Sequence, residues 1–141
     1  MQKENDSRST MRIEDIEAVF ADRKAGAEGN FKFFSVLVPL VEKEDGLYLL
    51  YEVRAQNMAR QPGEICFPGG ELEPDETTEE CALRETWEEI GIPQDQIRVI
   101  TQLDTLYTYS NFAMHCYLGV IPEAALDDLK FSENEVAEVF L

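Results

Sequence analysis

The feature that most constrains the fold is a helix with its own start and stop signals, predicted over residues 77–90. Thr77 followed three residues later by Glu80 is a capping-box pattern, which satisfies free backbone N–H groups at the start of a helix. Gly91 stands where a left-handed residue ends many helices, and Pro93 prevents further helical turns. Both boundaries are therefore predicted from local chemistry alone.

The two sides of this helix differ in chemistry. One stripe is apolar on a helical wheel, and we expect it to face the core: Leu83, Trp87 and Ile90. The other side carries three carboxylates within about 100° of one another: Glu85, Glu88 and Glu89. Carboxylate oxygens in this arrangement suit Mg²⁺ or Mn²⁺. An acidic outer face is also common on soluble helices, so the helix by itself does not decide the function.

Fixed distances around the helix narrow the function. Gly70 is followed after five residues by Glu76, and Glu76 after seven by Arg84 and the carboxylates, with Gly91 and Ile92 at the end. This spacing resembles the box of the Nudix hydrolase family, except that Thr86 stands where the family usually has an aliphatic residue or alanine. The resemblance implies a Nudix-type α/β/α sandwich with a mixed β-sheet, in the α/β (α+β) class. It also implies metal-dependent hydrolysis of a nucleoside diphosphate linked to another moiety.

The resemblance gives each position of the box a role. The metal, Mg²⁺ or Mn²⁺, would be held by three carboxylates and one backbone carbonyl: Glu85, Glu88, Glu89 and Gly70. Glu88 or Glu89 is the first candidate for the general base, and a glutamate outside the helix, Glu133 or Glu135, is the rival. Four further residues would support the box: Glu76 and Arg84 as an ion pair, and Gly69 and Gly91 at turns.

The segment before the box points to a substrate. It resembles the coenzyme A diphosphatase branch of the Nudix hydrolases, which places an Arg, a second Arg, a Gly and then Phe-Pro-Gly-Gly at set distances. Arg54, Gly63 and Phe67 match in register, whereas Ala59 holds the position of the second Arg and Arg60 follows it. The resemblance implies that coenzyme A or acyl-coenzyme A is cleaved to 3′,5′-ADP and (acyl-)4′-phosphopantetheine. The substrate-binding residues would be Arg54, Arg60, Gly63 and Phe67.

Two other functions are open at this stage. One is a Nudix hydrolase of ADP-ribose or another nucleotide, and the other is a nucleotide-binding module without catalysis. The formal net charge of −17 argues against nucleic acid as a partner, because Lys and Arg contacts dominate that affinity. It also means that an anionic substrate needs a divalent cation, local arginines or both, since like charges 4 Å apart repel by about 4 kcal/mol near a protein surface.

The remainder of the chain predicts one domain over residues 11–141, preceded by a disordered leader over residues 1–10. Apolar residues at helical spacing predict a short amphipathic helix between Arg12 and Arg23. Strands are expected over 33–41 and 47–54 as a hairpin, and over 65–67, 97–107, 112–121 and 135–141, with a short helix or turn over 122–130. The last strand stops at Leu141, so we expect the domain to continue beyond it.

Composition sets the cellular context. No apolar run reaches the roughly 18–20 residues of a membrane helix, and the polar N-terminus does not resemble a signal peptide, so a cytoplasmic location without membrane contact is expected. A homodimer is compatible with the sequence. The three cysteines show no paired spacing and are expected to be buried, reduced thiols, and His115 is expected in the core or at its rim.

Overall fold

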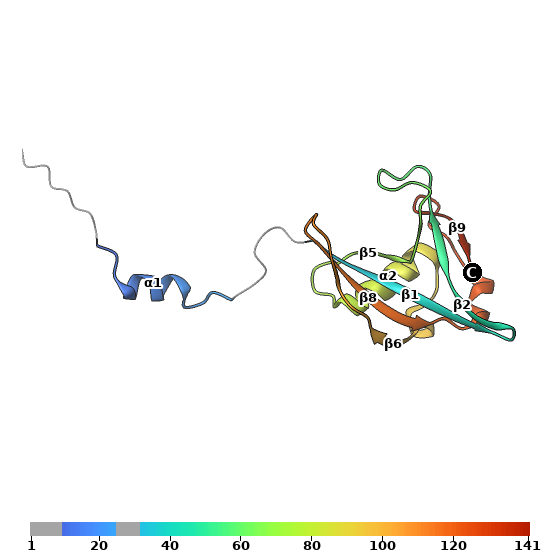
Figure 1. The fold of residues 1–141 in the computed structure, drawn as a ribbon, viewed down its shortest axis with the longest axis horizontal. Helices are drawn as coiled ribbons and strands as arrows, with labels where there is room; N and C mark the ends of the chain where they lie inside the picture. Colours follow the sequence, from blue (N-terminus) through green and yellow to red (C-terminus); the bar gives the residue numbers. More distant parts are fainter. Residues whose placement is uncertain (1–9, 25–31) are drawn as a thin grey trace, which may run out of the picture.

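The computed structural model describes residues 10–24 and 32–141, so the predicted leader lies outside the described residues except for Thr10 (Figure 1). The predicted N-terminal helix forms as α1 (Ile13–Phe20). None of its residues is buried, and the apolar side chains at its two ends, Ile13 and Phe20, are exposed. The helical spacing thus predicted the conformation of this segment, while its apolar side packs on nothing in the described chain.

A mixed sheet forms the main layer. Its strands run in the order β2 (Gly46–Leu49), β1 (Lys32–Lys43), β8 (Phe112–Val120) and β6 (Arg98–Gln102). The neighbours β1 and β8 are parallel, and their register joins Leu37 to Tyr117. The short strands β5 (Gly69–Glu71) and β7 (Leu106–Tyr107) add antiparallel pairs to β1 and β8. The mixed sheet and the α+β class predicted from the sequence are confirmed.

A second, antiparallel sheet has the order β4 (Ile65–Cys66), β3 (Tyr51–Arg54) and β9 (Val136–Phe140). The prediction of one strand over 47–54 was wrong, because the chain leaves the first sheet at Leu50 and enters the second. Leu50 is fully buried, and its N–H donates to the carbonyl of Pro39. The predicted strand 97–107 is likewise divided into β6 and β7, with a register shift in the β6–β8 pair between Val99 and Thr101.

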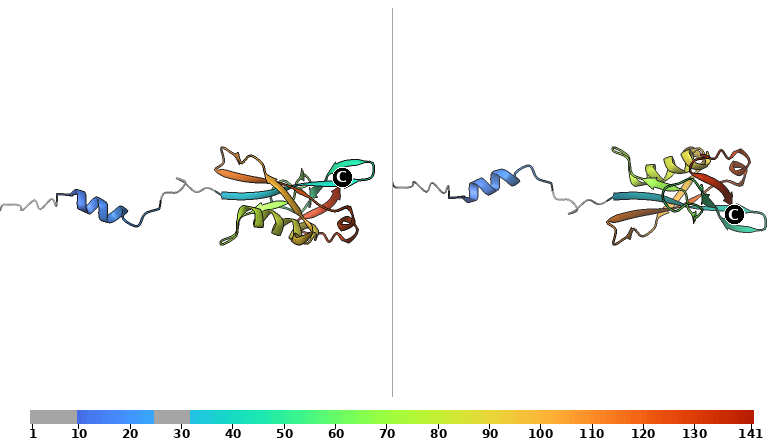
Figure 2. Two further views of the ribbon diagram at one scale, coloured as in Figure 1. Left: turned by 90° about the horizontal axis from the view of Figure 1, so that it is seen from below. Right: turned by 90° about the horizontal axis from the view of Figure 1, so that it is seen from above.

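Helix α2 (Thr78–Ile90) packs against β1 and β5 and lies on one side of β1 and β8 (Figure 2). The predicted capping box is confirmed, since the Thr77 hydroxyl accepts from the Glu80 N–H and the Glu80 carboxylate accepts from the Thr77 N–H. Gly91 ends the helix with φ at 79°, and its N–H donates to the Trp87 carbonyl. Two short 3₁₀ helices follow in the chain, η1 (Gln94–Gln96) and η2 (Glu123–Asp128).

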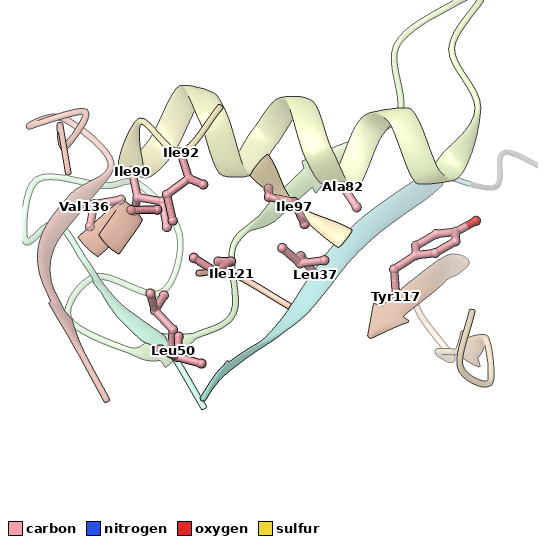
Figure 3. Close-up of a cluster of buried hydrophobic side chains, with 11 residues drawn as sticks. Leu37, Leu50, Ala82, Ile90, Ile92, Ile97, Tyr117, Ile121 and Val136 are labelled. Carbon is pink, nitrogen blue, oxygen red and sulfur yellow. The ribbon is translucent and has the colours of Figure 1, made fainter. Parts of the chain in front are cut away.

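The core lies between α2 and the two sheets (Figure 3). Leu37 of β1, Ile90 of α2 and Ile121 are fully buried and belong to one cluster. Leu50 and Val136 extend this cluster to the second sheet, so both sheets share one core. This arrangement places β5 beside Cys81 and Glu85 of the helix, and Glu89 near its C-terminal end toward Glu52 of β3.

The predicted apolar stripe of α2 was partly wrong. Ile90 is buried and Leu83 packs against the core, but the Trp87 side chain is 53% exposed. The buried residues of the helix are Cys81, Ala82, Thr86, Glu89 and Ile90. The sheets therefore cover a side of α2 that includes Thr86 and Glu89, and not the side centred on Trp87. Thr86 fits there without strain, since its hydroxyl donates to the Ala82 carbonyl one turn earlier at 2.8 Å.

The cysteines are free thiols, with Cys81 and Cys116 buried and Cys66 half-buried. His115 lies half-buried in β8, where its Nδ1 is 3.3 Å from the Thr105 hydroxyl. No helix in residues 10–24 and 32–141 is long and apolar enough to cross a membrane.

Candidate metal centre

Arg84 lies at the centre of the carboxylates that α2 and the preceding loop bring together. Its Nη1 atom is 2.8 Å from Glu85 Oε1 and 3.0 Å from Glu88 Oε2. Its Nε and Nη2 atoms donate to the two oxygens of Glu76 at 2.9 and 2.8 Å. A single guanidinium therefore holds three carboxylates, which is the planar, many-donor role that arginine performs and lysine does not.

The Glu76–Arg84 pair ties the loop after β5 to the helix. Both side chains are largely shielded from water, at 14% and 16% exposed. Glu76 also accepts from the backbone N–H of Glu73, which closes the loop. The hydrogen bonds from Arg84, above all, lower the pKa of Glu76 to about 2. Such a bidentate, shielded pair is far stronger than an exposed ion pair.

Two glycines let the backbone of β5 approach its neighbours closely, Gly70 toward α2 and Gly69 toward β1. A Cβ atom on Gly70 would lie 2.4 Å from the Glu85 carboxyl group, so a larger residue there would displace that carboxylate. A Cβ atom on Gly69 would lie 2.4 Å from the Ser35 carbonyl oxygen in β1. The Gly70 carbonyl itself accepts a long contact from the Cys81 thiol at 3.6 Å. Gly70 thus allows β5 to lie close to the carboxylate of Glu85, and Gly69 allows β5 to lie close to β1.

The Glu89 side chain points in a different direction from the side chains of Glu85 and Glu88. Its side chain turns inward, at 7% exposed, and faces Glu52 of β3, which is 2% exposed. The two carboxyl groups lie within hydrogen-bonding reach of each other. Burial raises the pKa of Glu52, and burial together with Glu52 raises the pKa of Glu89 far above its ordinary value. Burial also raises the pKa of Glu85, against the opposing effect of Arg84.

The sequence did not identify Glu52 as a site residue. It stands between Tyr51 and Val53 in a strand, where successive side chains alternate, so Glu52 points to the opposite face of the sheet from these two neighbours. Which face is buried depends on what the second sheet packs against, and the helix and strands that share its core come from distant parts of the chain. A charged residue inside an apolar strand pattern was the one available signal.

The two rival glutamates outside the helix differ in their relation to the cluster. The segment that carries them is fastened to α2, since the Ser132 N–H donates to the Glu89 carbonyl. The charge of Glu135 contributes to raising the pKa of Glu85 and of Glu89. Glu135 and Glu88 also line one open groove along the C-terminal half of α2. Glu135 is therefore the rival that lies near the carboxylates.

The predicted substrate residues lie in and beside the loop over residues 55–64. The Arg54 guanidinium donates to the Arg60 carbonyl through Nε at 3.3 Å and Nη2 at 3.1 Å. Gly63 has φ at 72°, and its N–H donates to the Arg54 carbonyl, which closes the loop. Phe67 stacks on Tyr51 with ring centroids 5.0 Å apart. The loop thus brings Arg54 and Arg60 together, with the Arg60 side chain exposed.

The residues present fit a hard divalent cation by their chemistry. Glu52 Oε2 and Glu89 Oε2 are buried and, as carboxylate oxygens, receive no hydrogen bond. Oxygen ligands of this kind suit Mg²⁺ or Mn²⁺. Among residues 10–24 and 32–141, no three acidic, His or Cys side chains already converge on one point. The reason lies in the contacts above, because Arg84 engages Glu85 and Glu88 while Glu89 turns to Glu52.

Comparison with known proteins identifies the family. The NUDIX domain matches residues 32–141, which includes both sheets, α2 and the carboxylate cluster. The chain belongs to the Nudix family. Helix α1 precedes the matched range.

Curated Nudix relatives share a third or more of the aligned residues. The chain is 40% identical over 112 residues to the peroxisomal coenzyme A diphosphatase NUDT7 of Mus musculus, covering 76% of this chain and 45% of that protein. It is 37% identical over 108 residues to Nudix hydrolase 3 of Caenorhabditis elegans, covering 75% and 45%. The chain therefore spans about half the length of these relatives.

The Nudix fold is also seen in solved structures. The C. elegans Ap4A hydrolase, solved as a binary complex, superimposes with a TM-score of 0.63 over 76% of each chain, at 21% identity. This likeness concerns the fold alone.

Proposed function

We propose that this chain is a divalent-metal-dependent diphosphatase, which hydrolyses a nucleoside diphosphate linked to another moiety. The observation that carries the proposal is the gathering of carboxylates around α2, two of them buried with oxygens that receive no hydrogen bond. Glu85, Glu88 and Glu89 would hold Mg²⁺ or Mn²⁺, with the Gly70 carbonyl beside them. A bound divalent ion lowers the pKa of an attacking water and offsets charge on the phosphoryl oxygens.

The chain's own residues would divide the remaining work. Arg84 holds Glu85 and Glu88 in place, and Glu76 fixes Arg84 from the loop side. Glu88 is our candidate for the general base, because its side chain is 44% exposed and open to a water molecule. The alternatives to test are Glu89, which is buried, and Glu135, which lines the same groove along α2 as Glu88. A general base must lie within reach of the proton that it removes.

We further propose coenzyme A or acyl-coenzyme A as the substrate class. The support is the segment from Arg54 to Gly70, together with the mouse relative whose name states coenzyme A diphosphatase. The displaced arginine is compatible with this assignment. Arg60 lies in an irregular loop next to Arg54, so a one-residue shift does not turn its side chain to the opposite face as it would in a strand. Arginines are well suited to bind phosphate oxygens in so acidic a protein.

A substrate panel with Mg²⁺ or Mn²⁺ tests the two levels of the proposal separately. Coenzyme A should yield 3′,5′-ADP and 4′-phosphopantetheine, while ADP-ribose and dinucleoside polyphosphates should react more slowly. If ADP-ribose is split and coenzyme A is not, the substrate assignment is wrong and the diphosphatase assignment stands. If no compound of the panel is hydrolysed but several bind, the chain is a nucleotide-binding module instead.

Matched variants locate the chemistry. Glu85→Gln and Glu89→Gln should each abolish turnover, because each removes a charge that would hold the metal. Arg60→Ala should raise KM for coenzyme A by about tenfold or more, since hydrogen bonds to charged groups are worth about 1.5–3 kcal/mol. Arg98→Ala, which removes an exposed arginine from β6 of the first sheet, is the control and should leave KM unchanged. Equal effects of the two arginine variants would contradict a substrate role for Arg60.

A further inference from the structure

Glu52 has surroundings that a structural residue rarely has. It lies on the central strand of the second sheet, opposite Cys66 of β4 and Val139 of β9. Its side chain is 2% exposed, although Tyr51 and Val53 on either side are only half-buried. Carboxylates are seldom buried so completely unless they are paired or bind a metal.

The positive charge of Arg54 acts on Glu52, but few groups contact its carboxylate oxygens directly. Cys66 directs its thiol toward Glu52 Oε1 at a long 3.6 Å. The Glu52 Oε2 atom receives no hydrogen bond, and the same holds for Oε2 of Glu89, the carboxyl group that it faces. None of the ion pairs found in the described part of the chain includes Glu52 or Glu89.

Two facing, buried carboxylates need a positive charge between them. A shared proton would supply one such charge, and a divalent cation would supply two. The second solution also explains why the pair lies next to the carboxylate cluster: Glu89 belongs to the same helix as Glu85, one turn later, and Glu85 is also largely buried. A cation held there would join α2 to β3 of the second sheet, two elements that residues 55–77 separate in the sequence.

We propose that Glu52 is a further metal-holding residue of this centre, which shares the divalent cation with Glu89 from strand β3. This inference rests on the proposed function, because it assumes that Glu89 holds metal. Glu52 lies outside the fixed spacing of the box, so the second sheet as well as the helix contributes to the centre. Metal binding should therefore stabilise the contact between the two.

Direct Mn²⁺ binding tests this inference without any activity measurement. The free Mn²⁺ signal in electron paramagnetic resonance is followed as the metal is titrated into the full chain and its variants. Glu52→Gln should weaken Mn²⁺ binding by about tenfold or more, and it should reduce the rise in Tm that Mn²⁺ produces. Without metal, its Tm should equal or exceed that of the parent, because a neutral amide replaces a buried charge and donates to Glu89.

The control is Glu138→Gln, which removes an exposed carboxylate from β9 at the position paired with Val53. It should bind Mn²⁺ as the parent chain does. If Glu52→Gln does not unfold cooperatively, Glu52→Asp replaces it, and this variant should keep the Mn²⁺-induced rise in Tm because the carboxylate is retained. Loss of both that rise and Mn²⁺ affinity in Glu52→Asp would contradict the inference, because the retained carboxylate should still hold the metal.

The outcomes separate this inference from the proposed function. Parent-like Mn²⁺ affinity in Glu52→Gln, with weakened binding in Glu89→Gln, would overturn the role of Glu52 and leave the metal centre of the helix intact. Parent-like affinity in Glu85→Gln and Glu89→Gln as well would overturn the metal assignment itself. Weakened binding in Glu52→Gln and Glu89→Gln, with no change in Glu138→Gln, would support the shared site.

Discussion

Removal of the Glu76 charge should lower stability in a manner that depends on pH. Glu76 is the carboxylate held most firmly by Arg84, with contacts at 2.8 and 2.9 Å and a side chain that is 14% exposed. A carboxyl pKa lowered from its ordinary 4.5 to about 2 corresponds to about 3 kcal/mol of stability at pH 7, since each pKa unit is worth about 1.4 kcal/mol. Arg84 keeps Glu85 and Glu88 as partners, so we expect Glu76→Gln to cost about 2–3 kcal/mol.

The sign of the pH effect follows from the direction of the shift. Because the folded-state pKa of Glu76 is depressed, its contribution is fully present above about pH 4.5 and is lost as the pH falls toward 2. At pH 3 the group is ionised in the folded chain and mostly protonated in the unfolded chain, so the difference between parent and variant should shrink to about 1 kcal/mol. Other carboxyl groups titrate equally in both proteins and cancel in this difference.

Urea unfolding followed by circular dichroism, in a metal-free buffer at pH 7 and pH 3, measures both quantities. Glu73→Gln is the matched control, because Glu73 also approaches Arg84, at 3.7 Å, but has a side chain that is 63% exposed. Such an exposed pair contributes at most about 1 kcal/mol. A loss below about 1 kcal/mol in Glu76→Gln at pH 7, or a difference that does not shrink at pH 3, would refute the reasoning.

Two further variants test the packing of the helix by the same unfolding assay. Ile90→Ala should cost about 2–5 kcal/mol because Ile90 is fully buried, whereas Trp87→Ala should cost about 1 kcal/mol because more than half of its side chain is exposed; equal losses would indicate that the helix buries the face expected from its apolar stripe. Gly70→Ala should lower stability by about 1–3 kcal/mol and reduce turnover, because the added Cβ would lie 2.4 Å from the Glu85 carboxyl group; full activity in that variant would show that the carboxylate can be displaced without consequence.

The elements that were predicted well are those fixed by neighbours in the sequence. The capping box of Thr77 and Glu80 and the left-handed Gly91 involve contacts within one turn of the chain, so both ends of α2 were predictable. The spacing from Gly70 to Ile92 indicated the family in the same way, since it is a property of the chain alone. The breaks between strands were harder to predict. The chain passes from one sheet to the other at Leu50 because that side chain is buried in the shared core, and the local sequence does not show this.

The carboxylates around the helix were likewise predictable in their positions but not in their directions. Their presence at positions 85, 88 and 89 was determined by the sequence, and helical geometry placed them on one side. Their directions were decided by the tertiary structure: Arg84 holds Glu85 and Glu88, while the packing of the second sheet turns Glu89 inward to Glu52. A helical wheel describes one helix in isolation, whereas burial depends on which elements pack against it. Glu52 and Glu89 are brought together by the packing of α2 and the second sheet around one core, and no local pattern in the sequence encodes that packing.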